Sequence, residues 1–172
     1  MEDLKKLIRD VQDFPKEGII FKDISTLLKD GPQFRKSVDL LAEQDNPENI
    51  DLVLGVGSRG FIFGAALAYK WGKPFIIVRK PGKLPAATVK EEYELEYGTD
   101  AIEIHRDAIS KDQRVLIVDD LLATGGTVAA VTRLVEKLGG KIAGIAFLIE
   151  LSFLKGKELI SKYDVFSLLK YE

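Results

Sequence analysis

The chain has 172 residues, which corresponds to a single domain. Its 25 Lys and Arg residues nearly balance 27 Asp and Glu residues, so the net charge of −2 gives no positive surplus for holding a nucleic acid. The absence of cysteine excludes disulfides, thiolate metal sites and thiol nucleophiles, and a single histidine excludes a metal centre made of several histidines. The first residues resemble neither a signal peptide nor a membrane span, so we expect a cytoplasmic protein without membrane contact.

Two helices are predicted in the first third of the chain. Apolar residues recur at helical spacing over residues 4–11, which predicts an amphipathic helix that ends at the Phe-Pro pair of residues 14–15. A short apolar segment covers residues 18–21. A second helical pattern begins after an Asp-Gly-Pro turn at residues 30–32 and stops at the Asn-Pro pair of residues 46–47.

The centre and the end of the chain alternate between predicted strands and helices. Short apolar segments rich in β-branched residues are typical of strands buried in a parallel sheet, and they cover residues 51–55, 74–79, 114–120 and 141–150. Helical stretches lie between them at residues 61–72 and 127–140. This alternation predicts an α/β fold with a parallel β-sheet core flanked by helices. A binding site is expected outside the carboxyl ends of the strands.

One segment interrupts the alternation. Apolar residues alternate with glutamates over residues 92–97, and after a turn at residues 98–100 a second alternating run follows. This pattern predicts a β-hairpin with one polar face. The residues before it are rich in Pro, Gly and Lys and have no periodicity, so we expect a mobile loop that leads into the hairpin.

A glycine-rich turn, GVGSRG at residues 55–60, joins a predicted strand to a predicted helix. It matches the G-x-G-x-x-G dinucleotide fingerprint, whose backbone N–H groups bind phosphate at a helix N-terminus. That fingerprint also requires an acid about 20 residues later. Here the next predicted strand ends in Arg79 and Lys80, which favour a second phosphate. A purely structural turn and a nicotinamide-dependent oxidoreductase remain the alternatives for this motif.

A second turn, TGGT at residues 124–127, follows an apolar strand that ends in Asp119 and Asp120. Its backbone N–H groups and its two threonine hydroxyls can bind a phosphate at the start of the next helix. The two carboxylates repel phosphate but accept hydrogen bonds from hydroxyl groups, so they suit the 2′- and 3′-hydroxyls of a ribose 5′-phosphate. The alternative is a pair of acids at a strand end, one of which caps the helix.

The segment VLIVDDLLATGGT, residues 115–127, resembles the phosphoribosyl-diphosphate motif of the type I phosphoribosyltransferases. The adenine-specific branch of that family is also similar in FPKEGIIFKDIS at residues 14–25, SRGF at 58–61, RKPGKLP at 79–85, LEYG at 95–98, LSFLKG at 151–156 and the terminal YE. The resemblance covers nearly the whole chain. The chain departs from the family at Gly57, where an acid usually precedes the Ser-Arg pair.

The resemblance implies the type I phosphoribosyltransferase fold, with one domain over residues 1–172. Within it we expect a small N-terminal hood at about residues 1–35 and a flexible loop and hairpin at about residues 81–105. The part of this segment from residue 83 to residue 97 is expected to act as a lid that excludes water from the reaction. A homodimer is a further expectation from the family.

The implied reaction transfers the 5-phosphoribosyl group of 5-phosphoribosyl-1-diphosphate to adenine, with AMP and pyrophosphate as products. Mg²⁺ is expected as a cofactor that is held mainly by the substrate phosphates rather than by protein ligands. Two alternatives remain open. One is a phosphoribosyltransferase for another purine base, and the other is a non-catalytic regulator that binds the ribosyl diphosphate.

The resemblance also assigns site residues. Glu96 is expected to handle the purine N7 proton, and a solvated strand face is the alternative for it. For the base, Phe21 is expected to stack on adenine, although a core position is equally compatible with the sequence. The full assignment is Ile20, Phe21 and Arg59 for adenine; Ser58, Arg59, Arg79, Lys80 and Lys83 for pyrophosphate; and Asp119, Asp120, Ala123, Thr124, Gly125, Gly126 and Thr127 for ribose 5-phosphate.

Overall fold

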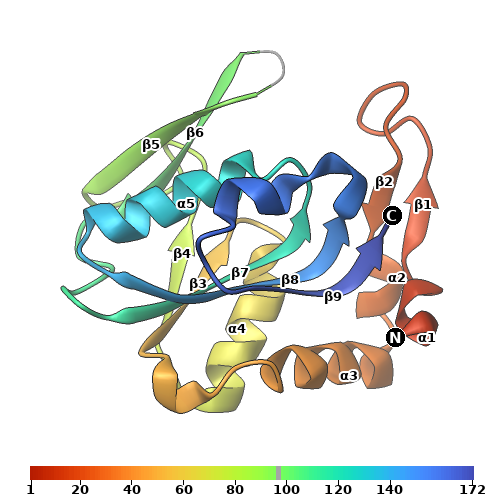
Figure 1. Cartoon of the computed structure of the whole chain (residues 1–172), viewed down its shortest axis with the longest axis horizontal. Coiled ribbons are helices and arrows are strands. Elements are labelled where there is room, and N and C mark those ends of the chain that lie inside the picture. Colours follow the sequence, from red (N-terminus) through yellow and green to blue (C-terminus); the bar gives the residue numbers. More distant parts are fainter. Residues whose placement is uncertain (96–97) are drawn as a thin grey trace.

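The computed structural model of the chain describes residues 1–95 and 98–172. A sheet of five parallel strands forms its centre, in the order β4-β3-β7-β8-β9 (Figure 1). This confirms the predicted fold class and the four predicted strands, and adds a fifth. The strands are β3 (Leu52–Val56), β4 (Phe75–Val78), β7 (Arg114–Leu122), β8 (Lys141–Leu151) and β9 (Val165–Tyr171).

Helices cover both faces of the sheet (Figure 1). The three long helices are α3 (Gly31–Ala42), α4 (Gly60–Trp71) and α5 (Gly126–Lys137), all near their predicted positions. Strand β7 shows why two layers are needed, because its side chains alternate between two buried clusters. Leu116 and Val118 belong to the cluster with α3 and α4, whereas Val115 and Ile117 belong to the cluster with α5. Within residues 1–95 and 98–172, no helix combines the length and the apolar character that crossing a membrane requires.

The N-terminal segment differs from its predicted helix. The helix α1 (Glu2–Lys5) is short, and residues after it form β1 (Arg9–Val11), which pairs antiparallel with β2 (Phe21–Asp23). The predicted helix up to residues 14–15 is therefore wrong beyond its first turn. Backbone pairing with a strand further along the chain outweighs the helical spacing, and it is reinforced by an ion pair of 2.5 Å between Arg9 Nη2 and Asp23 Oδ2.

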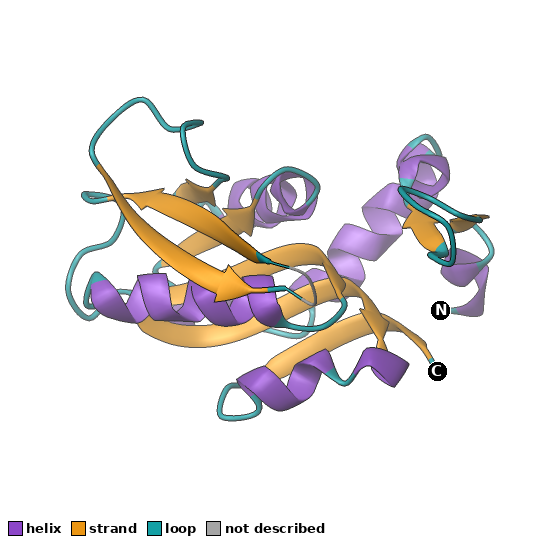
Figure 2. Ribbon diagram, turned by 90° about the horizontal axis from the view of Figure 1, so that it is seen from above, coloured by secondary structure: helices purple, strands orange, loops and turns teal. Residues whose placement is uncertain are grey.

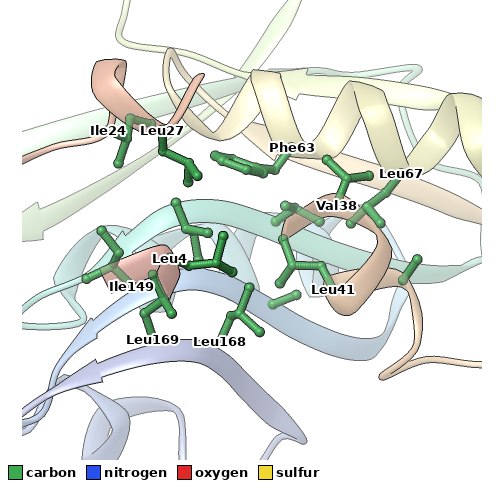
Figure 3. Packing of buried hydrophobic residues seen from close by; sticks show 14 of the residues in the cluster. Leu4, Ile24, Leu27, Val38, Leu41, Phe63, Leu67, Ile149, Leu168 and Leu169 are labelled. Carbon is green, nitrogen blue, oxygen red and sulfur yellow. The ribbon is translucent and has the colours of Figure 1, made fainter. Parts of the chain in front are cut away.

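This N-terminal segment is attached to the rest of the molecule by apolar packing. Leu4 of α1 and Leu27 of the short helix α2 (Ser25–Leu28) are fully buried. Figure 3 shows them facing Phe63 of α4 and the leucines of β9 in one cluster. Its apolar contacts therefore hold the hood segment against the sheet and α4.

The predicted hairpin is confirmed, with its first strand about four residues earlier than expected. It consists of β5 (Thr88–Glu94) and β6 (Thr99–His105). Glu91 fixes it to α5, because its carboxylate lies 2.7 Å from Arg133 Nε and 2.6 Å from Lys137 Nζ. Figure 2 shows the hairpin lying alongside α5 as a result. Tyr93 and Ile102 lie on the buried face of the hairpin.

Short turns of 3-10 helix lie in the connections between the larger elements. They are η1 (Pro47–Asn49), η2 (Ser152–Leu154) and η3 (Gly156–Ile160), and the last two connect β8 to β9. This connection returns the chain to the sheet edge beside β8.

An ion pair at the amino-terminal edge of the sheet gives a prediction for acid stability. Asp51 accepts hydrogen bonds from the backbone N–H of Arg114 at 2.7 Å and from its Nη2 at 2.8 Å, and these bonds hold the Asp51 pKa at about 2, below its usual value of 3.8. A carboxyl group whose pKa is lower in the folded protein than in the unfolded chain stabilises the fold at any pH above its pKa in the unfolded chain. This stabilisation is lost as the pH falls from about 4 to about 2.

We therefore expect Asp51→Asn to lower the unfolding midpoint at pH 7 and to have progressively less effect between pH 4 and pH 2. Chemical denaturation of both proteins across this range measures the difference. A destabilisation that is independent of pH would show that packing, rather than charge, is the contribution of Asp51.

Candidate active site

A cavity of about 280 Å³ opens where strands of the sheet reach their carboxyl ends. Its walls come from five parts of the chain: the turn after β3, the residues after β4, the end of β7, the turn from β7 into α5, and the buried face of the hairpin. This is the edge of a parallel sheet at which ligands bind in α/β proteins. The location predicted from the strand pattern therefore contains a cavity.

The two carboxylates at the end of β7 lie in this cavity. Asp120 is 5% exposed, and Arg59 Nε lies 2.9 Å from its Oδ2, which accepts no hydrogen bond from the described residues. Burial and then the neighbouring Asp120 charge raise the pKa of Asp119 well above its usual range. Burial also raises the Asp120 pKa, against the opposing effect of the Arg59 guanidinium. Both groups can accept hydrogen bonds from ligand hydroxyls when they are ionised.

The turn after β7 encloses a second, smaller cavity of about 80 Å³ that is bordered by residues 121–128 and Asp119. Gly125 has a φ of +85°, a conformation that glycine adopts at no cost, and it precedes the first turn of α5. Its N-cap residue, Gly125, has no side chain to cap the helix, so among the described residues the N–H groups of the first turn have no capping partner and are available to a ligand. An anion is the ligand that such a helix terminus favours.

The backbone of Gly156 packs against the backbone of this turn, a role that the sequence alone did not indicate. A Cβ on Gly156 would overlap the carbonyl oxygen of Ala123 and would lie 2.8 Å from the backbone nitrogen of Gly125. A Cβ on Gly125 would likewise overlap the carbonyl oxygen of Gly156. The two backbones are therefore in direct contact, and only glycine permits this approach.

A third cavity of about 160 Å³ lies beside the main one and is positively charged. Gly57, Ser58, Arg79, Lys80 and Lys83 border it. The structure thus brings together four of the five residues predicted for pyrophosphate, although they come from two separate segments of the chain.

Close packing around Gly57 leaves little room for the acidic side chain that the family usually has at this position. A Cβ at this position would lie 2.7 Å from Cζ of Phe61 and 2.9 Å from the carbonyl oxygen of Val78. A larger residue would therefore require the Phe61 ring to move. The peptide bond between Gly57 and Ser58 is cis.

Two of the residues predicted for the base, Ile20 and Phe21, lie on the hood and outside the lining of these cavities, whereas the third, Arg59, lies at the start of α4 and lines the main cavity. The guanidinium carbon of Arg59 lies 4.7 Å from the centre of the Phe21 ring, which also has an edge contact with Phe14 at 5.1 Å between ring centres. Ile20 is 49% exposed. Arg59 therefore lies between the Phe21 ring and the Asp120 carboxylate, and it connects the hood to the main cavity. Glu96 lies outside the described residues.

Residues 25–170 match the model of the phosphoribosyl transferase domain family. The adenine phosphoribosyltransferase of Acidobacterium capsulatum is 61% identical over 170 residues, which cover 99% of this chain and 94% of that protein. The crystal structure of the adenine phosphoribosyltransferase from Thermoanaerobacter pseudethanolicus superimposes with a TM-score of 0.96 at 54% identity, over 99% of both chains.

A more distant structure contains ligands. The adenine phosphoribosyltransferase of Saccharomyces cerevisiae, in complex with adenine and D-2,5-dideoxy-2,5-imino-altritol 1,6-bisphosphate, has a TM-score of 0.91 at 42% identity. The alignment covers 98% of this chain and 97% of the yeast chain.

Proposed function

The chain belongs to the phosphoribosyltransferase family, in its adenine-specific branch, and we propose that the three adjoining cavities bind the successive parts of its sugar substrate. The enzyme transfers the 5-phosphoribosyl group of 5-phosphoribosyl-1-diphosphate to adenine, giving AMP and pyrophosphate, which is a purine salvage reaction.

One observation carries the site proposal. The main cavity shares Asp119 and Thr127 with the small cavity at the turn, and it shares Ser58, Arg79 and Lys80 with the positively charged cavity. The order is therefore an anion site, then two hydroxyl-accepting carboxylates, then a cationic site. This is the order of 5′-phosphate, ribose hydroxyls and pyrophosphate in the substrate.

Ribose 5-phosphate is proposed to bind at the β7 end and the following turn. The N–H groups in the first turn of α5, including that of Thr127, and the hydroxyl of Thr124 bind the phosphate, while Asp119 and Asp120 accept hydrogen bonds from the ribose hydroxyls. Ala123, Gly125 and Gly126 contribute backbone groups only.

Pyrophosphate is proposed to bind among the cations of the third cavity. The bond between C1 of the ribose and the diphosphate oxygen breaks, and its electron pair leaves with pyrophosphate while N9 of adenine bonds to C1. The ring proton of adenine is lost from N7 and is taken up by Glu96 in this proposal. Arg79, Lys80 and Lys83 stabilise the negative charge that develops on the leaving group. Ser58 and its neighbours supply hydrogen-bond donors to the same group, with Arg59 at the boundary with the ribose.

Adenine is proposed to bind between the hood and the main cavity. Phe21 offers an aromatic face, and backbone groups of Ile20 and Arg59 recognise the edge of the base. The contact between Phe21 and Arg59 supports this location, because it brings the hood beside the ribose carboxylates.

Mg²⁺ fits these residues as a cofactor held mainly by the substrate. The ion prefers water and phosphate oxygens with one or two carboxylates, and Asp119 and Asp120 are the carboxylates that line the main cavity. No cluster of three potential metal-ligating side chains occurs in the described ranges. When bound, the ion would neutralise phosphate charge.

A base-competition assay tests the proposed function. Purified protein with Mg²⁺ and the ribosyl diphosphate receives adenine, hypoxanthine or guanine, and chromatography separates the nucleotides formed. We expect AMP from adenine as the dominant product, and loss of turnover when a chelator removes Mg²⁺. A folded protein that forms no AMP at saturating substrate would contradict the proposal, and equal use of hypoxanthine would contradict adenine specificity.

Glu96 is proposed to exchange a proton with N7 of the purine, by resemblance to the loop glutamate of the family. General acid or base groups contribute about 100-fold or more to rates, so Glu96→Gln is expected to lower kcat by about that factor and to change KM less. Steady-state kinetics measure both constants. Glu94→Gln, which changes an exposed glutamate two positions earlier in the sequence, is the control. Unchanged turnover in the Glu96 variant would make it a solvated surface residue.

A homodimer is proposed on the basis of α4. Apart from Lys70 in its last turn, this helix carries only apolar and aromatic side chains, which is typical of a buried helix, yet Tyr69 is 91% exposed and Ala65 is exposed too. A second copy covering this face accounts for the pattern. Light scattering of the protein and of Tyr69→Lys measures the mass, and a monomer in both cases would oppose the proposal.

We also propose a cytoplasmic location, because a highly charged sugar phosphate does not cross a bilayer unaided, and cell fractionation tests it.

A further inference from the structure

Tyr93 of β5 lies in the wall of the main cavity and has no role in the assignment above. Its side chain is 7% exposed, and its ring lies against the phosphate turn, since a Cβ on Gly126 would be 3.4 Å from its Cδ2. The ring therefore packs on the backbone where the 5′-phosphate is proposed to bind. This contact brings the hairpin directly to the site.

The hydroxyl of Tyr93 makes three hydrogen bonds. It accepts one from Thr127 Oγ1 at 3.3 Å and one from Lys80 Nζ at 3.2 Å, and it donates one to Asp100 Oδ2 at 3.2 Å. A phenol hydroxyl has one donor and two acceptor positions, so this arrangement uses all of them. Each partner belongs to a different element of the structure.

Two of these partners border different cavities of the proposed substrate site. Thr127 borders the small cavity for the 5′-phosphate, whereas Lys80 borders the cationic cavity for pyrophosphate. We infer that Tyr93 is a positioning residue, whose single hydroxyl holds Thr127, and with it the start of α5, and the Lys80 ammonium in place before the substrate arrives. This inference rests on the proposed function of both cavities.

The physical basis is conformational freedom. Threonine in a helix divides between two side-chain rotamers, and the hydrogen bond that Thr127 donates to Tyr93 restricts it to one, which ties the first turn of α5 to the hairpin. Lysine loses about 2 kcal/mol of rotamer entropy when it is immobilised. A lysine that is already held in the free enzyme loses less of this freedom on binding, which favours affinity.

Asp100 sets the direction of these hydrogen bonds. It lies opposite Tyr93 in the register of the hairpin, and its carboxylate pairs with Lys80 as well as accepting the tyrosine proton. Because the tyrosine proton points to Asp100, both lone pairs of the hydroxyl are available to Thr127 and Lys80. The hairpin thereby acts on both phosphate sites through one atom.

Tyr93→Phe tests this role, since it removes the hydroxyl and keeps the buried ring. A net hydrogen bond of about 0.5 to 1.5 kcal/mol corresponds to a change of roughly two- to twelvefold. We expect dissociation constants for ribose 5-phosphate and for magnesium pyrophosphate, measured separately by calorimetry, both to rise about three- to tenfold. KM for the ribosyl diphosphate should rise similarly, whereas kcat and KM for adenine stay within about twofold, a split that general loss of structure does not produce.

Matched variants distinguish the role of Tyr93 from that of its partners. Thr127→Val is expected to weaken the binding of ribose 5-phosphate alone, and Lys80→Gln is expected to weaken the binding of pyrophosphate alone. Tyr163→Phe is the control, because it removes a hydroxyl that is bonded to Glu136 away from the cavities. Thermal unfolding of each variant verifies the fold.

Two results would overturn the inference separately. In the first, Thr127→Val lowers the affinity for ribose 5-phosphate and Lys80→Gln lowers the affinity for pyrophosphate. If Tyr93→Phe then binds both anions as the parent does, or loses affinity for only one of them, Tyr93 does not link the two sites. If neither partner variant affects its anion, the assignment of the two cavities is wrong, and the inference fails with it.

Discussion

Asp120→Asn is expected to lower kcat/KM for 5-phosphoribosyl-1-diphosphate by about 10- to 100-fold. A hydrogen bond to a charged group contributes about 1.5 to 3 kcal/mol, and each 1.4 kcal/mol is a factor of ten. The buried carboxylate of Asp120 pairs with Arg59 at 2.9 Å and keeps Oδ2 free of hydrogen bonds from the described residues. Asparagine has the same size but no charge, so it weakens both the ribose contact and the hold on Arg59.

Folding should survive this change. Burial raises the Asp120 pKa, which means that ionisation opposes folding, and a neutral side chain removes this cost. We therefore expect an unfolding midpoint close to that of the parent. Asp107→Asn, which neutralises an exposed carboxylate after the hairpin, is the control for charge alone. Unchanged kinetics in Asp120→Asn would make the ribose assignment wrong.

The same groups predict the acid side of the pH profile. Burial raises the pKa values of Asp119 and Asp120, so these carboxylates become protonated at a higher pH than an ordinary aspartate does. A protonated carboxyl loses acceptor capacity for the ribose hydroxyls. The acid limb of kcat/KM should therefore lie above the usual aspartate value of 3.8, and Asp120→Asn should change its position.

The elements that could be predicted from the sequence are those that depend on residues close to one another along the chain. The apolar strands and the helices α4 and α5 were predicted because their residues are buried on every turn or on both faces, so local pattern and final environment agree. The turn at residues 124–127 could equally be predicted from the sequence, since its adjacent glycines supply the positive φ that Gly125 adopts before α5. These features depend on neighbours in the sequence.

The failures involve partners that are distant in the sequence. Residues 9–11 have helical spacing, but they become a strand because residues 21–23 pair with them. Tyr93 looked like an alternating strand residue, and its significance depends on Thr127, which is 34 positions away. An alternation pattern indicates that a side chain is buried but does not identify the residue that it contacts. The linking role therefore needed the tertiary structure.

Gly156 is the clearest case, because its importance lies in the absence of a side chain. Gly156→Ala is expected to raise KM for the ribosyl diphosphate by up to about 100-fold, since an added Cβ must displace the Ala123 carbonyl, and a misplacement of about 1 Å in a binding group costs a factor of that order. KM for adenine should change little. Steady-state kinetics and calorimetry with ribose 5-phosphate measure these effects.

A matched glycine separates this contact from a general effect of alanine. Gly31→Ala adds the same methyl group where nothing lies within 4 Å, and it should leave KM unchanged. Neither Gly31 nor Gly156 has a positive φ, so backbone strain does not distinguish them. If both variants bind ribose 5-phosphate like the parent, the turn tolerates displacement and its position is set elsewhere. If Gly156→Ala alone loses affinity while its unfolding midpoint is retained, the connection between β8 and β9 determines the position of the phosphate turn.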